Sequence, residues 1–367
     1  MRHATKPCAS LFACLVLLAG PCALTAGERP SFFLDSLTWR ATDVVVASEG
    51  DLASGRLPVI ETWKGRLSLR DTLSIPELGG FAGEESRTEK NVQPTKGKNS
   101  GPVIVSGKRM VLFLTRPASG LARERDIWKG WEPASEQGGF AVSVAWIEGG
   151  NSYAMVQLRN PGPSELCRLA QSEVAMKKRV TALLGTQDSI AKLAGIPDTG
   201  ERAKRAAEYV RSDICFARKE AFRILAVCGI PALPVLRHLL EDKSNADQHG
   251  DIIDAMAAAG GRGLGPEFLG LLENELAFWK AKAPSLQKGW WNGTGLQWPE
   301  VEVLRSEYTK SIHILDALRN WGFTGARDAV RAVRDYWRAL PQLEDDSGLG
   351  QMSQGCDRVL NALDELR

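Results

Sequence analysis

The sequence predicts an α+β protein of two domains, in which an all-β domain comes first and a short α-helical solenoid follows. Two observations carry this prediction. Between residues 31 and 158, short β-branched and aromatic runs alternate with Gly, Pro and polar clusters, which is typical of all-β domains. From about residue 201 onward, apolar residues recur at helical spacing and a helix-pair pattern repeats, which is typical of stacked helical repeats.

The first 26 residues have the pattern of a secretory signal peptide. Arg2 and Lys6 precede the apolar run 11–18, and small residues follow at 22–26. This order of basic, apolar and small residues predicts cleavage after Ala26. The apolar run is too short to span a bilayer, which takes about 20 residues, and no later run is long enough either. We therefore expect an exported protein, periplasmic or extracellular, without a transmembrane segment.

Charge and composition exclude some classes of partner. Removal of Arg2 and Lys6 with the signal peptide reduces the 46 basic residues to the number of acidic residues, which is 44. A protein that binds nucleic acid or an anionic membrane needs a surplus of Lys and Arg to neutralise phosphates. We therefore expect a protein or a peptide as partner, and no nucleic acid.

The first domain is expected to span residues 27–160. Its predicted strands are residues 43–48, 56–63, 71–75, 110–114, 141–147 and 152–158. Gly149-Gly150-Asn151 has the composition of a hairpin turn between the last two strands. Residues 82–101 contain almost no apolar side chain, so we expect a mobile loop there. Pro and Gly at 161–163 end the domain, and Ser164 is expected to cap a helix that begins near Glu165.

Four segments of this domain resemble an OB-type barrel of the netrin-module or metalloprotease-inhibitor kind. The segments are ATDVVVASEG, VIETWKG, DTLSIPE and SGKRMVLFL. The resemblance rests on the turn Trp63-Lys64-Gly65 and on the last strand, which starts from Gly107. It implies a closed barrel and, as an alternative function, protease inhibition or enzyme regulation. The inhibitors use an amino-terminal disulfide-bonded cysteine against the metal, and residues 24–165 contain none, so this route is not expected. We expect Trp63 to pack in the core.

The second domain, residues 161–367, contains the repeat. Residues 217–240 read ARKEAFRILAVCGIPALPVLRHLL, which predicts two short antiparallel helices joined at Gly229. A shift of 32 residues superposes Gly261 on Gly229, and a third copy superposes Gly322 after an insertion. Three sets of apolar positions coincide: Ala221 with Ile253 and Ile314; Leu225 with Ala257 and Leu318; and Leu236 with Phe268.

This pattern resembles a HEAT repeat, with alanine in the first helix, Gly-x-x-Ala at the turn, and Pro and paired leucines in the second helix. The resemblance implies an elongated stack in which neighbouring pairs share one core. An ordinary helical bundle with a coincidental offset is the alternative.

Four cysteines stay in the mature chain: Cys167, Cys215, Cys228 and Cys356. An even number in an oxidising compartment favours disulfides. Cys215 and Cys228 lie about 20 Å apart if one helix carries both, which is too far for a bond. That leaves Cys167–Cys215 with Cys228–Cys356, or Cys167–Cys228 with Cys215–Cys356. Alternatively, Cys228 is a buried thiol of the core.

Catalytic and metal-binding motifs are scarce. The mature chain has three histidines, and none belongs to a His-Glu-x-x-His pattern; a Gly-x-Ser-x-Gly elbow and a Walker loop are also absent. The stretch that holds His238, Asp242, Asp247, His249, Asp251 and Asp254 has metal-ligand residue types, but its spacing also suits a solvated loop with acids at a helix start. We expect no catalytic residue, no cofactor and no metal.

The insertion at 285–300, SLQKGWWNGTGLQWPE, is the main candidate for binding. It places Trp290, Trp291 and Trp298 among glycines. Repeat insertions project on one face, often the binding face, and tryptophan is enriched in interface hot spots. The alternative is that these indoles cover an incomplete stack. The function we expect is therefore an exported, non-enzymatic binding or scaffold protein that uses its helical surface.

Overall fold

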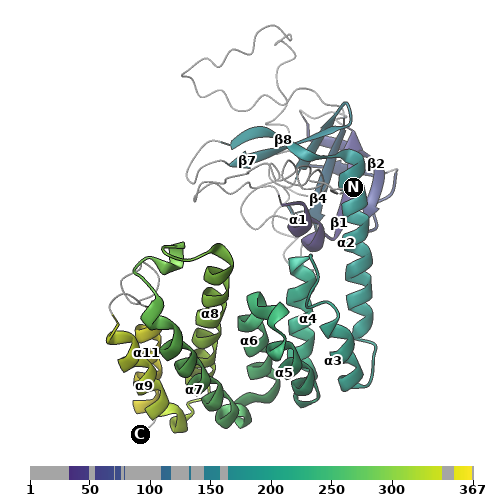
Figure 1. The fold of residues 1–367 in the computed structure, drawn as a ribbon. Helices are drawn as coiled ribbons and strands as arrows, with labels where there is room; N and C mark the ends of the chain where they lie inside the picture. Colours follow the sequence, from purple (N-terminus) through teal and green to yellow (C-terminus); the bar gives the residue numbers. More distant parts are fainter. Residues whose placement is uncertain are drawn as a thin grey trace, which may run out of the picture. The chain divides into compact units, whose positions relative to one another are not determined.

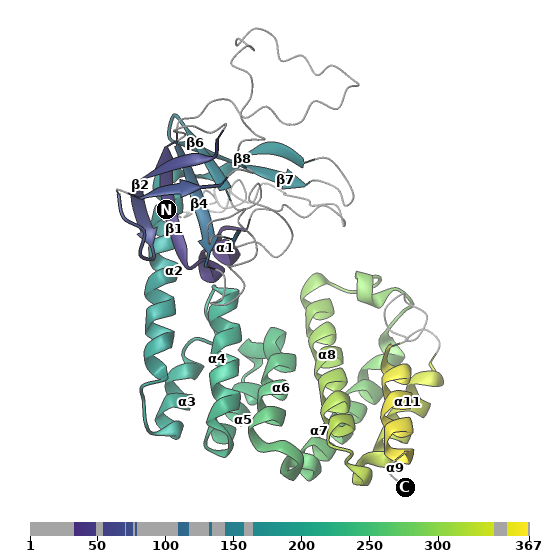
Figure 2. The same cartoon turned by 180° about the vertical axis from the view of Figure 1, so that it is seen from behind.

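Figures 1 and 2 present the computed structural model of the chain, which describes residues 33–48, 54–69, 71–75, 78, 109–116, 132–133, 144–157, 164–340 and 351–365. The chain divides into two compact units, residues 1–184 and 185–367. An antiparallel sheet builds the first and helices build the second, so the α+β class is confirmed. The expected signal peptide, residues 1–26, and the loop expected at 82–101 lie outside the described residues.

The described strands of the first unit form one eight-stranded antiparallel sheet. Their order is β3-β2-β1-β4-β6-β7-β8, with β5 beside β4. The strands are β1 (Asp43–Ser48), β2 (Arg56–Lys64), β3 (Thr72–Ser74), β4 (Arg109–Thr115), β5 (Glu132–Pro133), β6 (Val144–Glu148), β7 (Asn151–Gln157) and β8 (Ser164–Ser172). Among the described residues no pairing joins β3 to β8, so the sheet is open and the expected closed barrel is not formed.

The centre of the sheet is buried on both faces. Val44 and Val46 of β1 face a core that includes α1 (Leu34–Arg40) and the first half of α2 (Glu173–Leu193). Val45 and Ala47 point to the other face, where they pack with the apolar residues of β2 and β3. Two register shifts between β1 and β2 bend the sheet at this place, because each bulge increases the local twist.

The turn Trp63-Lys64-Gly65 ends β2 against a buried carboxylate. Gly65 has φ of 96°, and a Cβ there would lie 2.1 Å from Oδ1 of Asp43. Asp43 accepts hydrogen bonds from the Arg66 backbone at 2.8 Å and from Arg116 at 3.1 Å. Trp63 is half-buried against the core, as expected. Glycine is therefore required at position 65 both by its conformation and by the space that Asp43 occupies.

The hairpin at Gly149-Gly150 is confirmed, and the helix expected after it is wrong. Both glycines have positive φ, 56° and 80°, as a type I′ turn requires. Residues from Ser164 to Ser172 form β8, which pairs with β7, and helix α2 starts only at Glu173. By pairing with the edge of β7, this segment forms the hydrogen bonds that its backbone N–H and C=O groups need. The expected boundary near residue 160 thus falls before a strand of the sheet.

Three ion pairs hold the first half of α2 against the first unit. Arg179 forms a bidentate pair with Asp35 of α1, with 3.0 Å from Nε to Oδ1. Arg109 pairs with Glu173 at 2.6 Å, and Lys177 pairs with Glu61. Two residues of the basic cluster 177–179, Lys177 and Arg179, are therefore paired with acids of the same unit.

The second unit consists of helices that follow one another in pairs (Figures 1 and 2). They are α3 (Thr199–Ala207), α4 (Cys215–Cys228), α5 (Leu233–Glu241), α6 (His249–Gly260), α7 (Gly265–Lys282), α8 (Trp298–Asn320), α9 (Arg327–Arg338) and α11 (Gln351–Asp364). Helix α4 contacts α6, α6 contacts α8, and α8 contacts α11. Helices α5, α7 and α9 pack against α6, α8 and α11 respectively. One continuous apolar core runs through the unit.

The three turns predicted from the repeat each contain a glycine with positive φ. Gly229, Gly261 and Gly322 follow the ends of α4, α6 and α8 with φ of 68°, 58° and 58°. A short 3-10 turn follows each: η3 (Ile230–Ala232), η5 (Gly261–Leu264) and η8 (Thr324–Ala326). Side chains at the equivalent positions Ala221, Ile253 and Ile314 are all fully buried. The described helices include none that is long and apolar enough to cross a membrane.

Candidate functional site

The three tryptophans of the insertion have three different environments. Trp290 lies in η7 (Trp290–Asn292) and is 0% exposed. Its ring centre is 5.9 Å from Trp279 of α7 and 5.4 Å from Trp291. Trp279 in turn is 5.1 Å from Trp337 of α9, and Trp291 is 5.3 Å from Tyr308 of α8. Trp290 is thus a core residue at the centre of an aromatic cluster, in line with the alternative that the sequence left open.

Trp291 and Trp298 lie on either side of one arginine. The Arg305 Cζ is 5.1 Å from the ring centre of Trp291 and 4.9 Å from that of Trp298. Its Nε donates a hydrogen bond of 3.1 Å to the Trp291 carbonyl. Trp291 is half-buried, whereas Trp298 is 57% exposed. Cation–π contacts and this hydrogen bond hold both indoles in place, so the exposed ring is presented by a fixed support.

Glycines and a capping box shape the segment between the tryptophans. Gly289 and Gly293 have φ of 88° and 89°, in the left-handed region that favours glycine. Gln297 and Glu300 form a capping box, and Pro299 follows in the first turn of α8, which starts the helix at Trp298. Arg305 is two turns further along, so the i, i+7 spacing puts it on the same helix face as Trp298. This spacing is a signal that the sequence analysis missed.

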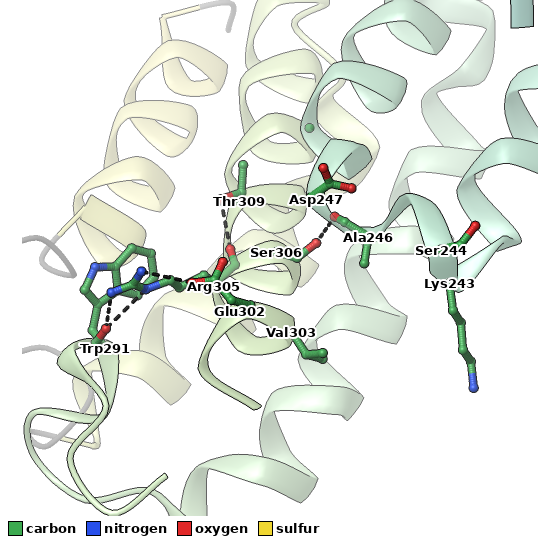
Figure 3. A pocket seen from close by; sticks show the side chains of 11 residues that line it. Lys243, Ser244, Ala246, Asp247, Trp291, Glu302, Val303, Arg305, Ser306 and Thr309 are labelled. Atoms are coloured by element: carbon green, nitrogen blue, oxygen red, sulfur yellow. Dashed lines mark hydrogen bonds and ion pairs between the residues drawn. The ribbon is translucent and has the colours of Figure 1, made fainter. Parts of the chain in front are cut away.

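A groove of about 450 Å³ lies beside this support. One side comes from η4 (Lys243–Gln248) and from Gly250 of α6. The other side comes from Trp291 and from the first turns of α8, as Figure 3 shows. Ser306 at its floor donates a hydrogen bond to the Ala246 carbonyl, which ties α8 to η4. Val303, half exposed at 50%, lies at its edge.

The groove presents hydroxyl groups, charges of both signs, an indole and a valine. Ser306 donates a hydrogen bond to the Ala246 carbonyl, and Thr309 donates one to the Arg305 carbonyl at 2.9 Å. Ser244 donates a hydrogen bond to the Asp242 carboxylate at 2.7 Å. Protein interfaces likewise mix aromatic, aliphatic and charged side chains.

A second hollow of about 350 Å³ lies on the other side of Val303. Phe278, Leu286, Leu296 and Leu304 give it a mainly apolar lining. Val303 therefore stands as a ridge between two depressions, with Trp298 at the start of the same helix. The sequence analysis identified the tryptophans but not this valine, because one apolar residue on a long helix is indistinguishable from core.

The His/Asp-rich stretch is dispersed in the structure. Asp242 accepts a 2.9 Å hydrogen bond from the Ser244 backbone at the start of η4, Asp254 pairs with His313 at 2.8 Å, and His249 is buried beside Glu307. His238 is exposed. Among the described residues there is no group of three or more His, Cys, Asp or Glu side chains that could hold a metal ion.

Three of the four candidate disulfide cysteines have described side chains. Cys215, Cys228 and Cys356 are free thiols, the first exposed and the other two buried. Helix α4 runs from Cys215 to Cys228, as the argument against a bond between them assumed. Burial raises the pKa of Cys228, and that of Cys356 to about 12. The side chain of Cys167 lies outside the described set, so disulfide formation stays a prediction.

Comparisons with protein-family models, with curated proteins and with solved structures found no match to this chain. The interpretation of the site therefore rests on the residues and contacts of the second unit: a fixed indole pair, an arginine between them, and two depressions separated by Val303.

Proposed function

We propose that the protein is an exported, non-enzymatic binding protein whose helical unit is a HEAT-like stack, and that it binds a protein or peptide partner at the groove beside Trp291. The observation that carries this proposal is the exposed indole of Trp298, whose ring lies against Arg305, a residue that lines the groove. An exposed large aromatic ring on a rigid support is the kind of residue that dominates binding energy in protein interfaces.

The HEAT-like description is supported by the recurrence of one turn. Three glycines at repeat-equivalent positions share positive φ, and each is followed by a 3-10 turn and a new helix. The contacts α4–α6, α6–α8 and α8–α11, each with a second helix behind, have the nearest-neighbour order of a repeat stack. Export is supported by the amino-terminal basic, apolar and small-residue order.

The test is partner capture with matched surface variants. Mature protein is used as bait on an extracytoplasmic fraction, and Trp298→Ala and Val303→Ser are compared with the wild type. Val303 lines both depressions, and Trp298 lies against Arg305 of the groove. Because both side chains are exposed, each variant should retain its fold and lose at least about tenfold in affinity for a captured partner, as hot-spot truncations do.

Val227→Ala is the control, because Val227 is also an exposed apolar residue of the helical unit, 68% accessible at the end of α4. It should bind as the wild type does. Equal capture by all four proteins would contradict the proposed site. Inhibition of a secreted protease by the mature protein, unaffected by these substitutions, would instead favour the alternative of an enzyme regulator that acts through the other unit.

A further inference from the structure

Helices α6 and α8 meet along a seam rich in ionisable groups, directly behind the groove. Lys310 of α8 lies between two carboxylates: its Nζ is 2.7 Å from Glu275 of α7 and also pairs with Glu307 of α8. Ser311 donates a 3.0 Å hydrogen bond to Glu275. All four side chains are mostly buried. One ammonium thus faces two carboxylates in an environment that disfavours excess charge.

His249, the first residue of α6, completes this group. Its Nδ1 is 3.8 Å from Glu307, and its ring is buried. Burial lowers the pKa of His249, the charge of Lys310 lowers it further, and Glu307 and Asp247 oppose the change. Burial also raises the pKa of Glu275 to about 7, against the effect of Lys310. The two shifts have opposite consequences: acidification favours the closed cluster through Glu275, whose pKa is raised, and favours release of the imidazole through His249, whose pKa is lowered.

A second histidine lies further along the same seam. His313 of α8 shares a 2.8 Å contact with Asp254 of α6, and this hydrogen bond raises the pKa of His313 against the effect of burial, with Asp251 and Asp316 adding to it. This pair is partly exposed, so its charging on acidification contributes little. The buried group around His249 is expected to dominate, because a desolvated charge without a full partner is far more costly.

The seam also forms the floor of the groove. Gly250 follows His249 directly and lines the groove, as do Ser306 and Thr309 beside Glu307 and Lys310. A Cβ on Gly250 would lie 2.8 Å from His313 Nε2 and 3.1 Å from Thr309, so the two helices approach closely there. Any separation of α6 from α8 at His249 would widen the groove.

We propose that the α6–α8 seam is a proton-sensitive joint: proton uptake by His249 loosens α6 from α8 and opens the groove beside Trp291 in acidic solution. Protonation of His249 places a second cation near Lys310 inside the closed seam, and separation of the helices lets water solvate that cation. Glu275 acts in the opposite direction, because its raised pKa makes proton uptake favour the closed seam. The consequence for partner binding rests on the proposed function, whereas the joint itself does not.

The test is hydrogen exchange of the full mature protein without partner, from pH 8 to pH 5, with rates corrected for intrinsic exchange. Opening that is linked to one proton increases up to about tenfold per pH unit below the pKa of the open state, and it levels off below the pKa of the closed state. Amides of residues 243–250 should therefore exchange about tenfold faster at pH 5 than at pH 7, while those of α3 should not. In His249→Gln this acid response should be lost, and in Glu275→Gln it should remain, because that variant removes only the group whose protonation favours the closed seam.

His238→Gln is the matched control, because His238 is an exposed histidine of α5 outside the seam; it should respond as the wild type does. A pH-independent wild type, or the same acid response in His249→Gln as in His238→Gln, would overturn the proposal. If His249→Gln does not fold, the NMR titration of the His249 imidazole in the wild type takes its place as the test. A pKa of His249 at or above about 6.5, the ordinary histidine value, would also overturn the proposal. Normal pH-dependent opening with no partner captured would refute only the proposed function.

Discussion

Trp290 and Trp298 belong to the same short segment but meet very different surroundings. Trp290 is packed between the rings of Trp279 and Trp291 and is fully buried. Trp298 contacts Arg305 and stays 57% exposed. The first ring contributes its buried area to stability, whereas the second leaves most of its area accessible to solvent. Substitution of each residue therefore tests a different property.

Trp290→Ala is expected to lower the free energy of unfolding by about 3–5 kcal/mol, because it leaves a cavity inside a packed cluster. Urea denaturation followed by far-UV circular dichroism measures this loss. Trp298→Ala serves as the matched control and should change stability by less than about 1 kcal/mol, as exposed substitutions usually do. Equal losses in the two variants would show that the exposed ring is also a structural residue.

At the scale of the element, the helix-pair turn depends on glycine backbone conformation. Gly229 and Gly261 have φ of 68° and 58° with ψ of −148° and −156°, a region that is essentially restricted to glycine. At Gly261 an added Cβ would have no other atom within 4 Å, so an alanine there would be destabilising only through its backbone conformation. The nearest atom at Gly229 is 3.8 Å away, which is an ordinary contact.

Gly229→Ala and Gly261→Ala should each destabilise the protein by about 1–3 kcal/mol, the usual cost of such backbone strain. Gly263→Ala is the control, because Gly263 belongs to the same turn, has open space around it and lacks positive φ. It should be close to neutral. Thermal unfolding of the three variants measures the effect. A neutral Gly261→Ala would mean that the turn accepts other conformations.

Elements with local signals were predictable from the sequence, and those set by partners in space were not. Asp43–Ser48 and the Gly149-Gly150 hairpin were found with their bounds almost unchanged, because β-branched runs and glycine pairs act locally. The sequence predicted a helix where β8 lies, because the spacing of Leu166 and Leu169 suits a helix. The segment is a strand because it pairs with the edge of β7. The open sheet could not be foreseen for the same reason.

The candidate site was predictable in part. The sequence identified the tryptophan insertion, but the division into one core ring and one exposed ring depends on Trp279, Tyr308 and Trp337, which come from three other helices. The contribution of Val303 and of η4 arises only when α8 packs against the turn before α6. Contacts of this kind, between residues far apart in the sequence, cannot be recognised from sequence spacing.

At the scale of the whole molecule, one core protects thiols that are far apart in the sequence. Cys228 of α4 and Cys356 of α11 are both buried in the same apolar core, and burial keeps both thiols protonated. Cys215 is exposed. Because the thiolate is the reactive form, a thiol reagent should react quickly with Cys215 and slowly with the other two.

Reaction with an aromatic disulfide reagent at pH 8 should therefore show one rapid phase that Cys215→Ser removes. The phases from Cys228 and Cys356 should appear at the rate at which the helical unit opens, and together in denaturant. Cysteines that stay unreactive in denaturant until a reductant is added would instead establish a disulfide, and peptide mapping would then distinguish the two predicted pairings.

The aromatic cluster gives this half of the chain an optical signature of its own. Rings from α7, η7, α8 and α9 lie within 6 Å of their neighbours in fixed, non-parallel orientations, an arrangement that produces strong near-ultraviolet ellipticity. That signal depends on four elements at once, whereas far-ultraviolet ellipticity depends on each helix alone. If the two signals disappear at one temperature, these elements unfold cooperatively; if the near-ultraviolet signal disappears first, the last helix pairs separate while still helical.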